Sequence, residues 1–167
     1  MLFPNVVILD GDQLRLAIAP DLGYTYEDRQ ESEARRSKLC HLLGQQGIHV
    51  ICAALSNYPQ WRSWCRETIE NYLEIYLEVP EPILHERDAK GIYEKLRAGT
   101  IKNVVGFDIT FHPPAAADLV IQNTGHETVE AVTDRIMHFL KSRGLLSPST
   151  NRPSKRKRKT NGQRKKR

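Results

Sequence analysis

The chain has 167 residues, of which 40% are hydrophobic and 27% charged, a balance typical of one soluble globular domain with its own core. No apolar run approaches the roughly 20 residues of a membrane span and no export signal is recognisable, so we expect a cytoplasmic protein that does not contact membranes. The net charge of +5 comes from residues 152–167, which contain ten Lys and Arg and no acid. The remaining body has 15 Lys and Arg against 20 Asp and Glu, which argues against a nucleic-acid-binding domain there.

The first predicted element is a buried strand of four apolar residues, Val6–Leu9. It runs into a predicted tight turn with two carboxylates, Asp10 and Asp12, and Arg15 follows shortly after. In open α/β sheets ligands bind at the carboxyl ends of strands, and this residue combination suits a phosphate-bearing ligand. The turn is therefore a candidate active-site edge. The alternative is an ordinary strand-to-loop turn, where Asp and Gly are common for conformational reasons.

The next predicted elements are a helix, a strand and a second helix. Thr25, with an acid three residues later, is typical of a helix start, and this helix should end near Gly47. The apolar run 48–55 predicts a second buried strand, with Ser56 and Asn57 at its carboxyl end. Residues 59–71 look helical, and we interpret their two tryptophans, Trp61 and Trp64, as core residues rather than as a ligand platform.

Alternation of apolar and polar residues over 73–79 is the clearest strand signal in the chain. Residues 85–106 are basic, glycine-containing and short of large apolar residues, which is typical either of a mobile lid over an anionic ligand or of a pair of solvated surface helices. A short strand over 118–122 and an amphipathic helix over 129–140 complete the pattern. The alternation of strands and helices predicts a doubly wound α/β fold.

Three cysteines, Cys40, Cys52 and Cys65, form no Cys-x-x-Cys pair, and the six histidines are scattered. We therefore expect buried, reduced thiols and no metal site. The domain should cover residues 1–146, followed by a disordered basic tail over 147–167. That tail could contact nucleic acid weakly, act as a nuclear import signal in a eukaryote, or have no special role.

Five short motifs follow one another in a recognisable order. They are Asp10-Gly11-Asp12-Gln13-Leu14-Arg15, Asp21-Leu22-Gly23-Tyr24, Glu27-Asp28-Arg29, Lys90-Gly91-Ile92-Tyr93 and Gly99-Thr100-Ile101-Lys102. Together they resemble adenylylsulfate kinase over about Val6 to Leu140. The resemblance implies a P-loop kinase fold, here without its first strand and helix and with a basic lid segment. It also implies transfer of the γ-phosphate of ATP, with Mg²⁺, to the 3′-hydroxyl of adenosine 5′-phosphosulfate, giving 3′-phosphoadenosine 5′-phosphosulfate for sulfate assimilation.

The resemblance further implies roles for matching residues on the substrate side. Asp12 would lie by the acceptor hydroxyl as base or metal-side carboxylate, with Asp10 supporting it, and Ser56 matches a serine proposed to form a phosphoserine intermediate. The residues matching substrate-binding positions are the phosphosulfate arginines Arg15 and Arg29, Tyr24 near the nucleotide, and the lid lysines Lys90 and Lys102. Such roles agree with phosphoryl transfer, which depends mainly on positioning and charge neutralisation.

On the ATP side, Arg87 matches a lid arginine of the family. Family members have a Gly-x-x-x-x-Gly-Lys-[Ser/Thr] loop ahead of the Asp-Gly-Asp turn, and no such motif occurs in this sequence. That loop cradles the phosphates and holds Mg²⁺. Further departures fall on the sulfate-nucleotide side: Ser32 for asparagine, Ala34 for arginine, Asn57 for proline, and Val104-Val105 for Phe-Thr.

Three hypotheses follow from these matches and departures. The chain could be an adenylylsulfate kinase whose true start lies upstream, or a catalytically inactive homologue that binds a nucleotide or a partner kinase subunit. It could also be a nuclear or nucleic-acid-associated protein that uses the basic tail. We expect the 167-residue chain to be inactive alone, to bind adenosine 5′-phosphosulfate weakly, and to associate with itself through open strands.

Overall fold

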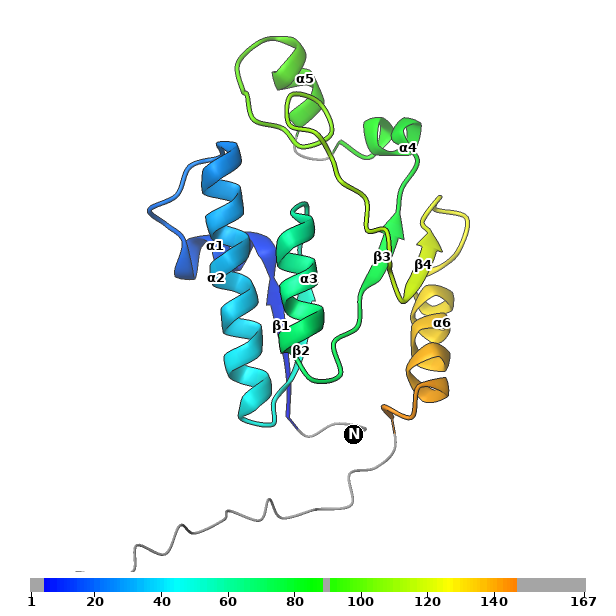
Figure 1. Ribbon diagram of the computed structural model, residues 1–167. Helices are drawn as coiled ribbons and strands as arrows, with labels where there is room; N and C mark the ends of the chain where they lie inside the picture. Colours follow the sequence, from blue (N-terminus) through cyan, green and yellow to red (C-terminus); the bar gives the residue numbers. More distant parts are fainter. Residues whose placement is uncertain (1–4, 89–90, 147–167) are drawn as a thin grey trace, which may run out of the picture.

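The computed structural model describes residues 5–88 and 91–146, in which strands and helices alternate (Figure 1). The order is β1 (Val6–Asp10), α1 (Gly11–Ile18), α2 (Tyr26–Gln45), β2 (His49–Ala53), α3 (Pro59–Thr68), β3 (Ile75–Glu78), α4 (Glu81–Glu86), α5 (Ile92–Arg97), β4 (Leu119–Gln122) and α6 (Val129–Ser142). All strand pairs between these elements are parallel, which confirms the predicted α/β class. Within the described ranges no helix is both long and apolar enough to span a membrane.

The four strands form two separate parallel pairs rather than one sheet. β1 pairs with β2, with Ile8 opposite Ile51, and β3 pairs with β4, with Leu77 opposite Ile121. Figure 1 shows the two pairs standing apart, with α3 in front of the space between them. The division agrees with the expectation, implied by the resemblance, of a fold without its first strand and helix.

Helices α2 and α3 cover one face of the β1–β2 pair (Figure 1). The helix α2 begins as predicted, because the Thr25 hydroxyl accepts a hydrogen bond from the Asp28 amide at 3.2 Å. Trp61 and Trp64 of α3 lie edge to face, with ring centroids 5.7 Å apart, and Trp64 also packs against His41 of α2. Both tryptophans thus pack at the helix interface, where they are half-buried rather than part of the fully buried core that the sequence interpretation expected.

The other face of the β1–β2 pair differs from its prediction. Both strands were expected to be buried, but the side chains of Val6, Ile8 and Ile51 are 40%, 68% and 55% exposed. On β1 they alternate with the less exposed Val7 and Leu9, so Val6 and Ile8 lie on one face, whereas on β2 every residue except Val50 is exposed. That expectation was wrong because only one face of the pair is covered within the described residues.

The prediction of a tight turn after β1 was also wrong, because the chain enters the helix α1 directly at Gly11. The prediction of buried cysteines holds only in part. All three are free thiols, Cys65 is buried as expected and Cys40 half-buried, but Cys52 lies exposed on β2. Of the segment 85–106, the described part forms the end of α4, the short helix α5 and a loop beyond the carboxyl end of β3 (Figure 1). Its closure as a lid stays a prediction.

Ion pairs connect the two strand pairs through α3. Arg62 is only 7% exposed, and its Nε lies 3.3 Å from a carboxylate oxygen of Glu74, just ahead of β3. Arg66 contacts Glu74 at 3.2 Å and Asp118, at the start of β4, at 3.0 Å. Asp118 also accepts a hydrogen bond from the Glu74 amide at 3.0 Å. Ion pairs from α3 thus connect the two strand pairs, which share no strand-to-strand hydrogen bonds in the described residues.

Candidate functional site

The beginning of α1 places two predicted carboxylates beside the carboxyl end of β2. One oxygen of Asp10 accepts hydrogen bonds from the amides of Asp12 and Gln13, both at 3.0 Å, so Asp10 caps the helix. A Cβ atom on Gly11 would lie 2.9 Å from the Cβ of Ala54, and only glycine permits this close approach. The sequence Asp-Gly-Asp therefore brings α1 tightly against the residues that follow β2.

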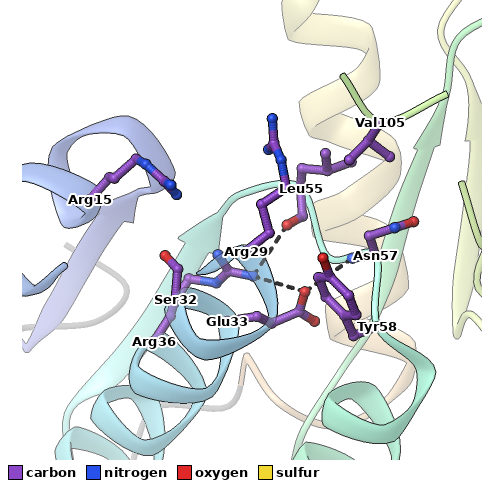
Figure 2. A pocket seen from close by; sticks show the side chains of 9 residues that line it. All are labelled: Arg15, Arg29, Ser32, Glu33, Arg36, Leu55, Asn57, Tyr58 and Val105. Atoms are coloured by element: carbon purple, nitrogen blue, oxygen red, sulfur yellow. Dashed lines mark hydrogen bonds and ion pairs between the residues drawn. The ribbon is translucent and has the colours of Figure 1, made fainter. Parts of the chain in front are cut away.

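Two adjoining hollows lie at this end of the β1–β2 pair, with volumes of about 290 Å³ and about 50 Å³. Five residues line both of them, and we call the combined space the arginine hollow: Arg15, Arg29, Ser32, Arg36 and Leu55. The larger hollow is also lined by Asp10, Asp12 and Tyr24, and the smaller by Glu33, Asn57, Tyr58 and Val105. Figure 2 shows the residues of the smaller part, with Arg15 standing apart from the group around Glu33.

Two guanidinium groups share the ring of Tyr24. The Arg15 group lies 4.1 Å and the Arg29 group 5.1 Å from the ring centroid, within the range of cation–π contacts. Burial, and then the positive charge of Arg15, lower the pKa of Arg29 from its ordinary value. Nη2 of Arg15 is buried and has no hydrogen-bond partner among the described residues. A buried donor without an acceptor is costly, so this end of Arg15 favours an anionic ligand.

The loop between α5 and β4 reaches the hollow through Arg29. Nη2 of Arg29 donates to the Asn103 carbonyl at 2.7 Å, and Nε lies 3.1 Å from the Tyr24 carbonyl. The loop is shaped by Asp108, whose carboxylate accepts hydrogen bonds from the amides of Asn103 and Val104. Two backbone carbonyls thus orient Arg29, and its charge has no carboxylate partner at ion-pair distance among the described residues.

Below the arginines lies a buried network around Glu33, which is 2% exposed. The Ser56 hydroxyl donates to one carboxylate oxygen of Glu33 at 2.5 Å. The Asn57 amide donates to the other oxygen at 3.1 Å, and a guanidinium nitrogen of Arg36 lies 3.6 Å from that oxygen (Figure 2). Burial raises the pKa of Glu33, although these three partners favour its charged form. Arg36 also donates to the Leu55 carbonyl at 3.2 Å, so Glu33 and Arg36 together position the segment after β2.

The structure brings five of the predicted site residues together around the arginine hollow, namely Asp10, Asp12, Arg15, Tyr24 and Arg29. Three other described residues do not line it. Ser56 turns its hydroxyl toward Glu33, Lys102 lies in the loop after α5, and Arg87 donates to Asn123 beyond β4 at 3.3 Å. Lys90 and the basic tail lie outside the described residues.

Sequence reasoning missed Glu33 and Arg36. Both lie in a strongly polar helix, where nothing in the local pattern separates a buried pair from solvated charges. A weak signal was available, since positions 29, 33 and 36 recur at helical spacing on the face that starts with the predicted Arg29. Their partners, however, follow a strand about twenty residues away, and local periodicity does not predict such contacts.

Chemically, the arginine hollow suits an anion that binds without a metal ion better than a triphosphate that carries Mg²⁺. Three arginines line it, and one of their nitrogens is buried without a partner. In contrast, no glycine-rich loop and no group of three His, Cys, Asp or Glu able to hold a metal ion occurs in the described residues. Asp10 already uses one carboxylate oxygen as a helix cap. The described residues alone therefore do not form a site for ATP and Mg²⁺.

Comparisons with known proteins identify the family of the chain. The family described as Adenylylsulphate kinase matches residues 4–122. The adenylyl-sulfate kinase of Halothermothrix orenii is 37% identical over 139 residues, which cover 83% of this chain and 75% of that protein. That of Myxococcus xanthus is 37% identical over 145 residues, covering 84% and 78%.

A solved structure matches as well. The APS kinase CysC of Mycobacterium tuberculosis, solved in complex with AMPPNP and APS, superposes with a TM-score of 0.73 at 30% identity, covering 82% of this chain and 80% of that one. Each of the three relatives therefore has a fifth to a quarter of its length without a counterpart here.

Proposed function

Because the chain belongs to the adenylylsulfate kinase family, whose reaction is ATP-dependent phosphorylation of the 3′-hydroxyl of adenosine 5′-phosphosulfate, we propose that the arginine hollow binds this phosphosulfate nucleotide. The observation that carries the proposal is the buried, unpartnered Nη2 of Arg15 beside Arg29. Two guanidinium groups on one aromatic ring repel each other, and an anion between them would relieve the repulsion. Arginine is also the side chain best suited to planar recognition of phosphate and sulfate groups.

Within this proposal each residue has a separate task. Arg15 and Arg29 bind the phosphosulfate, and Tyr24 holds both guanidinium groups in place through its ring. Asp12 lies in the same hollow, where it would accept the proton of the 3′-hydroxyl, while Asp10 fixes the start of α1. Ser56 acts indirectly, because its hydroxyl is bonded to the buried Glu33. Lys90, Lys102 and Arg87 stay predicted contributors from the lid.

ATP is the family's phosphoryl donor, but the described residues do not hold its phosphates. We therefore propose that the 167-residue chain by itself binds adenosine 5′-phosphosulfate and does not phosphorylate it. Catalysis needs a phosphate-cradling element and Mg²⁺ in addition to the residues described here. In this respect the chain corresponds to the acceptor half of a kinase site.

Isothermal titration of the purified chain with adenosine 5′-phosphosulfate tests the proposal. We expect weak binding that Arg29→Ala reduces by about 1.5–3 kcal/mol, the usual contribution of a hydrogen bond to a charged group. The matched control is Arg135→Ala on α6, which removes an exposed arginine paired with Glu127 far from the hollow in sequence and should leave binding unchanged. Equal affinity of the wild type and Arg29→Ala, or ATP-dependent phosphorylation by the chain alone, would contradict the proposal.

A further inference from the structure

Arg36 is the third arginine of the hollow, and the proposed function gives it no task. Arg29 and Arg36 are seven residues apart in α2, so they lie on one face of that helix. Arg36 lines both the larger and the smaller hollow, although its side chain is only 13% exposed. It is therefore a largely buried positive charge beside a space that a ligand can enter.

The contacts of Arg36 leave most of its donors available. Its polar contacts with described residues use Nη2, which donates to the Leu55 carbonyl at 3.2 Å and lies 3.6 Å from an oxygen of Glu33. The second separation is too long for a hydrogen bond. The oxygens of Glu33 instead accept from the Ser56 hydroxyl and the Asn57 amide. Nε and Nη1 of Arg36 have no hydrogen-bond acceptor within residues 5–88 and 91–146.

Neutralising Glu33 does not by itself account for Arg36. Among the described residues that line the smaller hollow are three guanidinium groups, those of Arg15, Arg29 and Arg36, and one carboxylate, that of Glu33. One carboxylate does not balance three cations, and a buried charge without a partner is costly. A negatively charged group of a ligand would supply the missing balance in this part of the hollow.

The volumes of the two hollows indicate which part of the nucleotide each can hold. The smaller measures about 50 Å³, several times the roughly 10–15 Å³ that admits one water molecule, so it has room for one small tetrahedral group but not for a nucleoside. The larger measures about 290 Å³ and contains Asp12, to which the proposed function assigns the acceptor hydroxyl. The nucleoside then occupies the larger hollow, and the far end of the phosphosulfate reaches the smaller one.

We propose that Arg36 binds the terminal sulfuryl group of adenosine 5′-phosphosulfate in the smaller hollow and thereby selects this nucleotide over AMP, which ends at the phosphate. The inference rests on the proposed function and adds a specificity-determining residue to it. Nη2 of Arg36 stays on the Leu55 carbonyl, so the segment after β2 positions the guanidinium, and Nη1 and Nε donate to the ligand. Arginine suits this task because its charge is spread over several donors.

Isothermal titration of the full 167-residue chain with adenosine 5′-phosphosulfate and, separately, with AMP tests this inference. The wild type should bind the phosphosulfate more tightly than AMP. Arg36→Ala should weaken phosphosulfate binding by about tenfold or more, the usual effect of losing a hydrogen bond to a charged group, and should leave AMP binding nearly unchanged. The matched control is Lys38→Ala, which removes an exposed positive charge of α2 that lies over the Trp61 ring and should change neither affinity.

A second variant keeps the test decisive if Arg36→Ala unfolds, which circular dichroism would show. Arg36→Lys keeps a charge beside Glu33 but has no planar group to bond Leu55 and the ligand together, so the preference for the phosphosulfate should again fall. No preference in the wild type, or an unchanged preference in a folded variant, would overturn this inference alone, provided that binding still depends on Arg29. If the wild type binds neither nucleotide, the proposed function fails and this inference fails with it.

Discussion

Glu33 is the residue whose environment differs most from what its type suggests. It is a carboxylate in a polar helix, yet it is 2% exposed and connects α2 to the segment after β2 through Ser56 and Asn57. Three partners favour its anion, but burial dominates and raises its pKa. Glu33 therefore positions residues that line the arginine hollow, and its raised pKa makes the stability of the fold depend on pH.

The sign of that dependence is testable with Glu33→Gln. The folded chain holds the Glu33 proton more tightly than the unfolded chain, whose ordinary pKa is 4.5, so this group lowers stability as pH rises from about 4.5 through its raised folded pKa. Urea unfolding at several pH values between 4.5 and 7.5 should show the wild type losing stability relative to Glu33→Gln as pH rises. Parallel stability curves would contradict the assignment.

At the scale of elements, the junction between α1 and β2 decides where the candidate carboxylates lie. The helix α1 starts without any intervening turn because Asp10 caps it and Gly11 has no Cβ to meet Ala54. Asp12 and Arg15 are then carried on the first turns of a rigid helix rather than on a flexible loop. Their position relative to Arg29 thus follows from one close contact between glycine and alanine.

Gly11→Ala should accordingly destabilise the fold, because its new Cβ would lie 2.9 Å from a Cβ atom and 3.3 Å from the backbone of residue 54. Overpacking of this kind costs about 1–3 kcal/mol. The control is Gly44→Ala within α2, where a Cβ meets nothing within 4 Å and helix propensity should add about 1 kcal/mol of stability. Urea denaturation of both variants measures the difference, and equal effects would show that the contact at Gly11 is relaxed.

For the whole molecule, the connection between its two strand pairs is unusual. Instead of backbone hydrogen bonds across a continuous sheet, the buried guanidinium of Arg62 contacts Glu74 and donates to the carbonyls of Ser56, His112 and Pro113. This one side chain thus bonds residues that follow β2, precede β3 and precede β4. Stability of the described fold should depend on it far more than on surface ion pairs.

Arg62→Ala should therefore cost about 3–5 kcal/mol, the usual effect of removing one partner from a buried ion pair. Arg135→Ala breaks an exposed pair with Glu127 and should cost less than about 1 kcal/mol. Thermal unfolding followed by circular dichroism would compare them. If Arg62→Ala unfolds on purification, hydrogen exchange of the milder Arg62→Lys should show faster exchange in β3 and β4 than in β1 and β2. Uniform protection in that variant would refute the connecting role.

Most element positions could be predicted because their signals are local. The Thr25 cap, the alternation over 73–79 and the apolar run before Asp10 each depend on a few neighbouring residues, and α2, β3 and β1 lie where those patterns place them. The motif order likewise identified the family, because the relevant residues recur at spacings that any chain of this family displays. These features need no knowledge of what packs against what.

Tertiary structure alone decided which strand faces are covered and which charges are buried. The apolar Ile8 is exposed and the charged Glu33 is buried, the reverse of what their residue types suggest. Burial depends on segments that are distant along the chain. The sheet divides at the β2 and β3 edges because each strand already has one partner and the described chain contains no fifth strand. The environment of Arg15 was decided in the same way, because its unpartnered nitrogen arises only where α1, Tyr24 and α2 converge.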